Sequence, residues 1–212
     1  MDKTYVIGGI RESEHRTTVE IITPSGDVKK LSMTPKLWEG YRLYSADTVS
    51  REIYEMLCAD SERCEAVTKA LRALTASTLS YGALNAKLKQ SGFSEDAVRA
   101  AVAIVRKRGL IDEESDASAI AEKMARSKGR GPARIKAELQ KKGYSPSVAS
   151  TAAYSVPQEI YEEALRKSLH AKCKGRVPED KAERDKLTAS LVRLGFSPSV
   201  IFSAMNELSW DE

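Results

Sequence analysis

The sequence predicts a mainly α-helical protein: three tandem three-helix repeats in an elongated array, preceded by a small N-terminal β-hairpin region. Short β-prone runs occupy the first 33 residues, helix-forming residues dominate the rest, and one segment pattern occurs three times. Hydrophobic residues make up 42% of the 212 residues, whereas aromatic residues make up only 6%. We therefore expect a packed core built mainly from small and aliphatic side chains.

Two β-prone runs flank a turn near the N-terminus. Residues 17–23 (TTVEIIT) and 27–33 (DVKKLSM) are separated by Pro-Ser-Gly, which favours a tight turn, so we expect a β-hairpin there. Another short strand is expected at residues 4–7. Thr34 followed by Pro35 predicts the start of a helix, because proline at the first helical position loses no hydrogen bond.

A segment that ends in Gly-aromatic-Ser occurs three times in the helical part. It reads LNAKLKQSGFSEDAV from residue 84, IKAELQKKGYSPSVA from residue 135 and LTASLVRLGFSPSVI from residue 187. Its glycines, Gly92, Gly143 and Gly195, are 51 and 52 residues apart. Leucine or isoleucine at i and i+4 gives an apolar helix stripe, and glycine supplies a left-handed cap that ends the helix. The serine is then placed to cap the next helix, and a preceding helix completes each unit.

These units predict a division of the chain into four parts. They are residues 1–60, a β-hairpin with a helical region, and three-helix repeats at residues 61–109, 110–158 and 159–212. The third repeat carries an insertion at residues 172–181 (KCKGRVPEDK), whose glycine, proline and mixed charges predict an exposed loop.

Basic residues concentrate in the second repeat. Residues 122–144 contain eight lysines and arginines against two glutamates, so ion pairing within the segment cannot neutralise it. We expect an anionic partner surface, with a solvated helix surface as the competing interpretation. The predicted partner- or nucleic-acid-binding residues are Lys128, Arg130, Arg134, Lys136, Lys141 and Lys142, with Arg106, Lys107 and Arg108 as secondary candidates.

The entry to this basic helix, Gly129 to Pro132, has two interpretations. Two glycines before a helix occur in helix-hairpin-helix DNA clamps, which expose backbone N–H groups to a phosphate. Such clamps normally place an apolar residue between the glycines, where this chain has Arg130, and Pro132 removes one donor. We favour the second interpretation, a tight turn with proline at the first helical position.

Several function classes find no support in the sequence. The P-loop, zincin and G-x-S-x-G motifs are absent, so we expect a non-enzymatic protein without cofactors. Three cysteines without a C-x-x-C pair and two distant histidines argue against a metal site or a disulfide framework. No apolar run is long enough for a membrane span, and we expect a cytoplasmic protein with no membrane partner.

The helical part resembles a known family. Leu110-Ile111-Asp112-Glu113 is similar to its entry segment, the run from Gly129 to Gly143 fits G-x-G-P-x-x-I-x-x-E-L-x-x-K-G, and residues 186–197 are similar to its K-L…L-x-R-R-G-F segment. On these motifs residues 65–212 resemble the regulatory protein RecX family, modulators of the bacterial recombinase RecA.

The resemblance implies a regulator in homologous recombination, DNA repair and the SOS response. It would bind the groove of the RecA filament on single-stranded DNA and limit ATP hydrolysis, filament growth and strand exchange. The expected partners are the RecA filament and, as a second candidate, single-stranded DNA, and we expect a monomer. Two alternatives stay open: an autonomous nucleic-acid-binding helical-repeat protein, and a helical scaffold for another protein.

Overall fold

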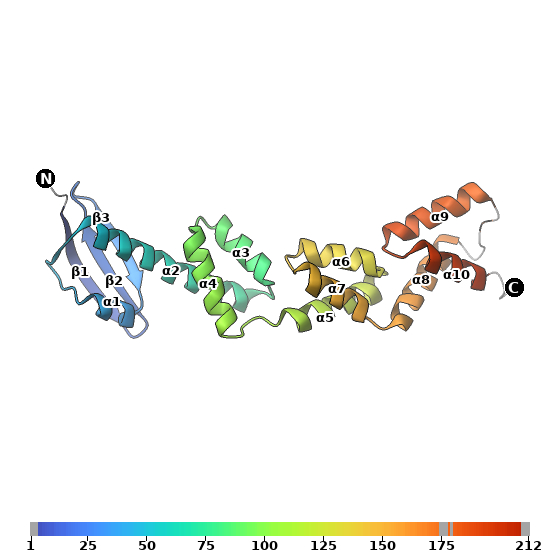
Figure 1. Ribbon diagram of the computed structural model, residues 1–212, viewed down its shortest axis with the longest axis horizontal. Helices are drawn as coiled ribbons and strands as arrows, with labels where there is room; N and C mark the ends of the chain where they lie inside the picture. The colour runs from blue at the N-terminus through green and yellow to red at the C-terminus, as the bar shows by residue number, and fades with distance from the viewer. Residues whose placement is uncertain (1–3, 174–177, 179, 209–212) are drawn as a thin grey trace. The chain divides into compact units, whose positions relative to one another are not determined.

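The computed structural model describes residues 4–173, 178 and 180–208, and it divides into two compact units. The first unit comprises residues 1–79 with 84–111, and the second comprises residues 80–83 with 112–212. Most of the described residues are helical, and antiparallel strands are confined to the N-terminal part, as the sequence predicted (Figure 1). None of the described helices is long and apolar enough to cross a membrane.

A four-stranded antiparallel sheet forms the N-terminal part. Its strands are β1 (Tyr5–Ser13), β2 (Arg16–Ile22), β3 (Val28–Met33) and β4 (Thr48–Val49), in the order β3-β2-β1-β4. The predicted hairpin corresponds to β2 and β3, but β1 is longer than expected and β4 is an addition. The extra residues of β1 pair with β2 across a short turn, with Ser13 opposite Arg16. Strand β4 depends on pairing between distant residues, such as Tyr5 opposite Val49, which a local pattern does not reveal.

One face of the sheet packs against α1 (Pro35–Tyr41) and α2 (Arg51–Ala76). Trp38 of α1 and Leu57 of α2 are buried against Ile7, Val19 and other inward-facing residues of the sheet. Thr34 caps α1 as predicted, because its hydroxyl accepts a hydrogen bond from the Leu37 N–H at 3.4 Å, and Pro35 occupies the first turn. The sheet and its two helices thus share one core.

Helix α2 connects this sheet to α3 (Tyr81–Gln90) and α4 (Glu95–Lys107). The Ser61 hydroxyl accepts a hydrogen bond from the Ser32 N–H of β3 at 2.8 Å. The next residue, Glu62, accepts the N–H and the hydroxyl of Ser94, at the start of α4, at 2.7 Å each. Because α2 runs from residue 51 to 76, residue 60 lies inside this helix. The four-part division of the chain stays a prediction.

The second unit contains six described helices. They are α5 (Glu113–Lys128), α6 (Pro132–Lys141), α7 (Pro146–Ser155), α8 (Gln158–Cys173), α9 (Lys181–Arg193) and α10 (Pro198–Leu208). One hydrophobic core runs through all of them and includes Ile135, Leu165 and Ile201. Since this core is continuous across the second and third predicted repeats, the three tandem repeats also stay a prediction. Most of the predicted loop at 172–181 lies outside the described residues.

The three Gly-aromatic-Ser segments adopt the predicted local structure. We call residues 91–93, 142–144 and 194–196 the glycine turns. Their glycines have φ of +86°, +85° and +99°, in the left-handed region that ends a helix at little cost only for glycine. The serine after each turn accepts a hydrogen bond from the backbone N–H three residues later, at 3.2 to 3.4 Å. These serines are Ser94, Ser145 and Ser197.

Candidate partner-binding surface

The backbone N–H groups of Gly129, Arg130 and Gly131, at the entry to α6, all donate to carbonyls within the protein. Gly129 ends α5 in the left-handed conformation, and its N–H donates to the Ala125 carbonyl. The Arg130 N–H donates to Met124, and the Gly131 N–H donates to the Leu194 carbonyl at 2.7 Å. A phosphate clamp needs such N–H groups to be free, and Pro132 has none to offer. The structure therefore supports the tight turn with proline at the first position, and excludes the clamp in this conformation.

The start of α6 packs directly against the third glycine turn and donates hydrogen bonds to it, an arrangement that we call seated. Besides the bond from Gly131, the Ala133 N–H donates to the Gly195 carbonyl at 3.2 Å. A Cβ on Gly131 would lie 2.5 Å from the Gly195 carbonyl carbon, 2.6 Å from its oxygen and 2.7 Å from the Phe196 nitrogen. These distances are too short for any side chain. The glycine at position 131 is thus required by packing and not by its own backbone conformation.

The second glycine turn is covered in the same way by residues 80–83, which belong to the same unit. The buried Ser80 hydroxyl donates to the Lys142 carbonyl at 2.8 Å and accepts the Ala83 N–H at 3.0 Å. A Cβ on Gly82 would come well within 3.0 Å of the Gly143 carbonyl. Sequence reasoning missed Ser80 and Gly82. A glycine in the first turn of a helix, where glycine is otherwise unfavourable, was the available signal.

Two of the predicted basic residues lie near one carboxylate. Glu138 lies 2.8 Å from the Arg134 guanidinium, one helical turn away, and 3.9 Å from that of Arg130. The hydrogen bond from Arg134 is the main cause that lowers the pKa of Glu138, and the charges of Arg134, Arg130 and Lys128 lower it further against the effect of burial. The Arg130 side chain is only 28% exposed. Arg134 is therefore hydrogen-bonded to Glu138, whereas the buried Arg130 Nε has no hydrogen-bond partner among the described residues.

The lysines of the predicted surface differ from these arginines. Lys128, Lys141 and Lys142 are exposed, and Lys136 is half-buried. Lys128 ends α5, whereas Lys141 and Lys142 lie at the C-terminal end of α6, where cations also interact favourably with the helix dipole. Five of these six residues thus lie on α5, α6 or their connecting turn, and Lys142 directly follows α6 as its C-cap. We call these six residues, Lys128, Arg130, Arg134, Lys136, Lys141 and Lys142, the second-unit basic residues.

The three secondary candidates lie elsewhere. Arg106, Lys107 and Arg108 are exposed at the C-terminal end of α4, in the first unit. Basic residues in the last turn of a helix are favourable in any soluble protein because they face its negative end. Among the described residues, no group of three potential ligands is placed to hold a metal ion.

The chain is similar in sequence to proteins that are named regulatory protein RecX. Searches against family models found no match. The chain is 21% identical over 214 residues to the regulatory protein RecX of Oceanobacillus iheyensis, which covers all of this chain and 79% of the relative. It is 28% identical over 160 residues to the regulatory protein RecX of Prosthecochloris aestuarii, which covers 71% of this chain and 97% of the relative.

Solved structures give the same result for the fold. A crystal structure of a regulatory protein RecX superimposes with a TM-score of 0.73 over 95% of this chain and 99% of that chain, at 20% identity. The RecX of Lactobacillus salivarius superimposes with a TM-score of 0.61 over 70% of this chain and 97% of that chain, at 22% identity. The resemblance to the RecX regulatory proteins that the motifs indicated is thereby confirmed in sequence and in fold.

Proposed function

We propose that this chain is a non-enzymatic regulator that binds the groove of a RecA filament on single-stranded DNA and inhibits its ATP hydrolysis, growth and strand exchange. It would act as a monomer in the cytoplasm, in homologous recombination and DNA repair. Its helices would work as three tandem repeats, with the second-unit basic residues against acidic filament surface or nearby DNA. Arg106, Lys107 and Arg108 would extend the contact.

The observation that carries this proposal is the likeness to regulatory RecX proteins along nearly the whole chain. The charge balance supports it independently. The two glutamates of residues 122–144, Glu122 and Glu138, are paired with Arg126 and Arg134, so each neutralises one cation of eight. The remaining surplus of positive charge lies on the C-terminal half of α5, on α6 and beside the ends of α6, where it favours an anionic partner.

The test is RecA-dependent ATP hydrolysis on single-stranded DNA, measured with increasing amounts of this protein. We expect hydrolysis to fall as the protein approaches stoichiometry with RecA. If the rate of ATP hydrolysis is unchanged at stoichiometric amounts and the protein does not bind the filament, the proposal is refuted.

Charge-neutralising variants test the second-unit basic residues. Replacing Lys141 and Lys142 by glutamine should weaken inhibition, because both are exposed and neither substitution disturbs the core. Replacing Lys69 and Arg72, which are exposed on α2, removes the same charge elsewhere and serves as the control. Equal loss in both variants would indicate a general charge effect and contradict the assignment of this surface.

Autonomous nucleic-acid binding is the second candidate, and the same basic surplus favours it. If about four phosphates of a single strand are neutralised, the logarithm of affinity falls with the logarithm of salt at a slope of about −3. Fluorescence anisotropy on a labelled single strand between low and high salt measures this slope in the absence of RecA. Binding with that slope supports the second candidate, whereas binding that requires RecA supports the first.

A further inference from the structure

The first glycine turn differs from the other two in what covers it. The turns at Gly143 and Gly195 each receive the start of a helix, which donates hydrogen bonds to turn carbonyls and places a glycine at the closest approach. A Cβ on Gly92, in contrast, would meet no atom within 4 Å. The same local structure is therefore covered twice and open once among the described residues.

The solvent exposure of the aromatic residue also differs between the covered turns and the open turn. Tyr144 and Phe196, in the covered turns, are 5% and 4% exposed. Phe93, in the open turn, is only half-buried, and Gly92 beside it is exposed. The first glycine turn thus has exposed residues, Ser91 and Gly92, beside a half-buried aromatic residue.

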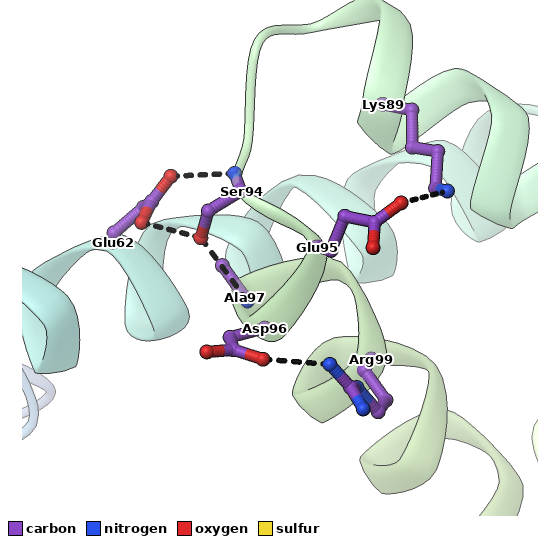
Figure 2. A network of polar contacts seen from close by, with 7 residues as sticks. All are labelled: Glu62, Lys89, Ser94, Glu95, Asp96, Ala97 and Arg99. Carbon is purple, nitrogen blue, oxygen red and sulfur yellow. Dashed lines mark hydrogen bonds and ion pairs between the residues drawn. The ribbon is translucent and has the colours of Figure 1, made fainter.

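The open turn is nevertheless held in place (Figure 2). The Glu62 carboxylate, from α2, accepts both the N–H and the hydroxyl of Ser94 at 2.7 Å, and that hydroxyl accepts the Ala97 N–H at 3.3 Å. Lys89 at the end of α3 and Glu95 at the start of α4 form an ion pair at 2.8 Å across the turn. In the covered turns the corresponding serines, Ser145 and Ser197, instead contact a neighbouring serine hydroxyl. A surface already fixed before binding loses little entropy on association.

We propose that the first glycine turn, residues 91–93, is a docking point for the N-terminus of a helix of a partner protein. That helix would carry glycine, or a residue nearly as small, at its start and would donate N–H or hydroxyl groups to the turn carbonyls. This chemistry is read from the two segments that cover the sister turns. The inference rests on the proposed function, in which the partner is the recombinase filament.

A second copy of this chain does not fit the turn. Among the described helices, only α3 and α6 have a glycine in or just before the first turn, Gly82 and Gly131, and both are already seated on glycine turns. Helix α9 begins with Asp180 as its own cap, bonded to the Glu183 N–H at 3.1 Å. Side chains at its start would prevent the close approach seen in the covered turns. The occupant is therefore a different protein.

The test compares Gly92→Asn with Gly109→Asn. Both glycines have positive φ, +86° and +60°, and both have open space around the position of a Cβ. Asparagine tolerates the left-handed conformation better than other residues, so both variants should fold equally well, while the side chain at 92 blocks close approach. We expect Gly92→Asn to bind RecA filaments at least about tenfold more weakly than Gly109→Asn, which corresponds to one or two lost hydrogen bonds.

Filament binding is measured by co-sedimentation with RecA on single-stranded DNA, and circular dichroism and thermal unfolding verify the fold of each variant. If the wild type binds and the two variants bind equally, the docking inference is overturned and the proposed function stands. If the wild type itself does not bind, the proposed function fails and the inference falls with it. Should Gly92→Asn unfold, Ser91→Gln adds bulk at the exposed rim without changing the glycine and is held to the same comparison.

Discussion

For the substitution Gly131→Ser, local helix-capping preferences and long-range packing predict opposite effects on stability. Gly131 is the N-cap of α6 with φ −83° and ψ 170°, a conformation that serine adopts readily. Serine is also a slightly better N-cap than glycine, by a few tenths of a kcal/mol. Local reasoning alone therefore predicts that Gly131→Ser is neutral or slightly stabilising.

The packing predicts the opposite sign. A Cβ at this position would lie 2.5 to 2.7 Å from three backbone atoms of Gly195 and Phe196, where ordinary contact is 3.4 to 4 Å. Backbone atoms cannot move aside as a side chain can, so α6 and the turn must separate by about 1 Å. Overpacking of this kind costs about 1–3 kcal/mol, and each of the two hydrogen bonds that would lengthen contributes about 1 kcal/mol. We expect a net destabilisation of the second unit by about 2–4 kcal/mol.

Hydrogen exchange followed by mass spectrometry can locate this effect. Amides of α6 and α9 that exchange through opening of the second unit should exchange about 30-fold faster or more, since about 1.4 kcal/mol corresponds to a factor of ten. Strands β1 to β3, in the first unit, provide an internal reference. Gly40→Ser, at a position where a Cβ meets no atom within 4 Å, is the matched control. Unchanged or slower exchange in α6 and α9 of Gly131→Ser would refute the packing argument.

Three further changes test other contacts. Glu62→Ala removes two charge-assisted hydrogen bonds to the start of α4 and should lower the free energy of unfolding by about 1–2 kcal/mol in urea titrations. The pKa of Glu138 is lowered in the folded state by Arg134, so the stability from this carboxylate is present above its ordinary value of 4.5 and is lost as pH falls through the lowered pKa. Urea titrations between about pH 6 and about pH 3, a range that spans the ordinary pKa of glutamate, measure the free energy of unfolding. This free energy should depend less on pH in Glu138→Gln than in the wild type. Tyr161→Phe leaves the buried Ala153 carbonyl without its donor and should cost about 1–2 kcal/mol. Burial raises the pKa of Tyr161 to about 12, so absorbance titration should show a tyrosine with this pKa in the wild type that is missing in Tyr161→Phe.

The parts of the fold that depend on neighbouring residues could be predicted from the sequence. The glycine that ends each helix and the serine that begins the next one act within about four residues, and each residue type has one strong reason to be there. The same holds for Thr34 and Pro35 at the start of α1. These elements were predicted correctly because their structure depends little on the rest of the chain.

Contacts between distant residues could not be predicted in this way. The bond from Ser61 to β3, the bond from Glu62 to Ser94 and the seat of Gly131 on Gly195 each join residues 29 to 64 positions apart. A glycine that is needed because another backbone lies against it looks, in the sequence, like any glycine near a helix end. The candidate surface shows the same limit, because only the structure distinguishes Arg134, which is bound to Glu138, from exposed lysines such as Lys141.

The glycine turns differ in whether a helix start packs against them. A helix start can be seated only if it has a small residue at the contact, as Gly82 and Gly131 provide. Helix α9 has Asp180 instead of glycine at its start, and the Asp180 carboxylate accepts the Glu183 N–H. The turn at Gly92, in contrast, has no helix start packed against it among the described residues. Among the described residues both helix starts that carry glycine are seated and the first glycine turn is open, and this asymmetry favours a partner of different sequence over self-association at that turn.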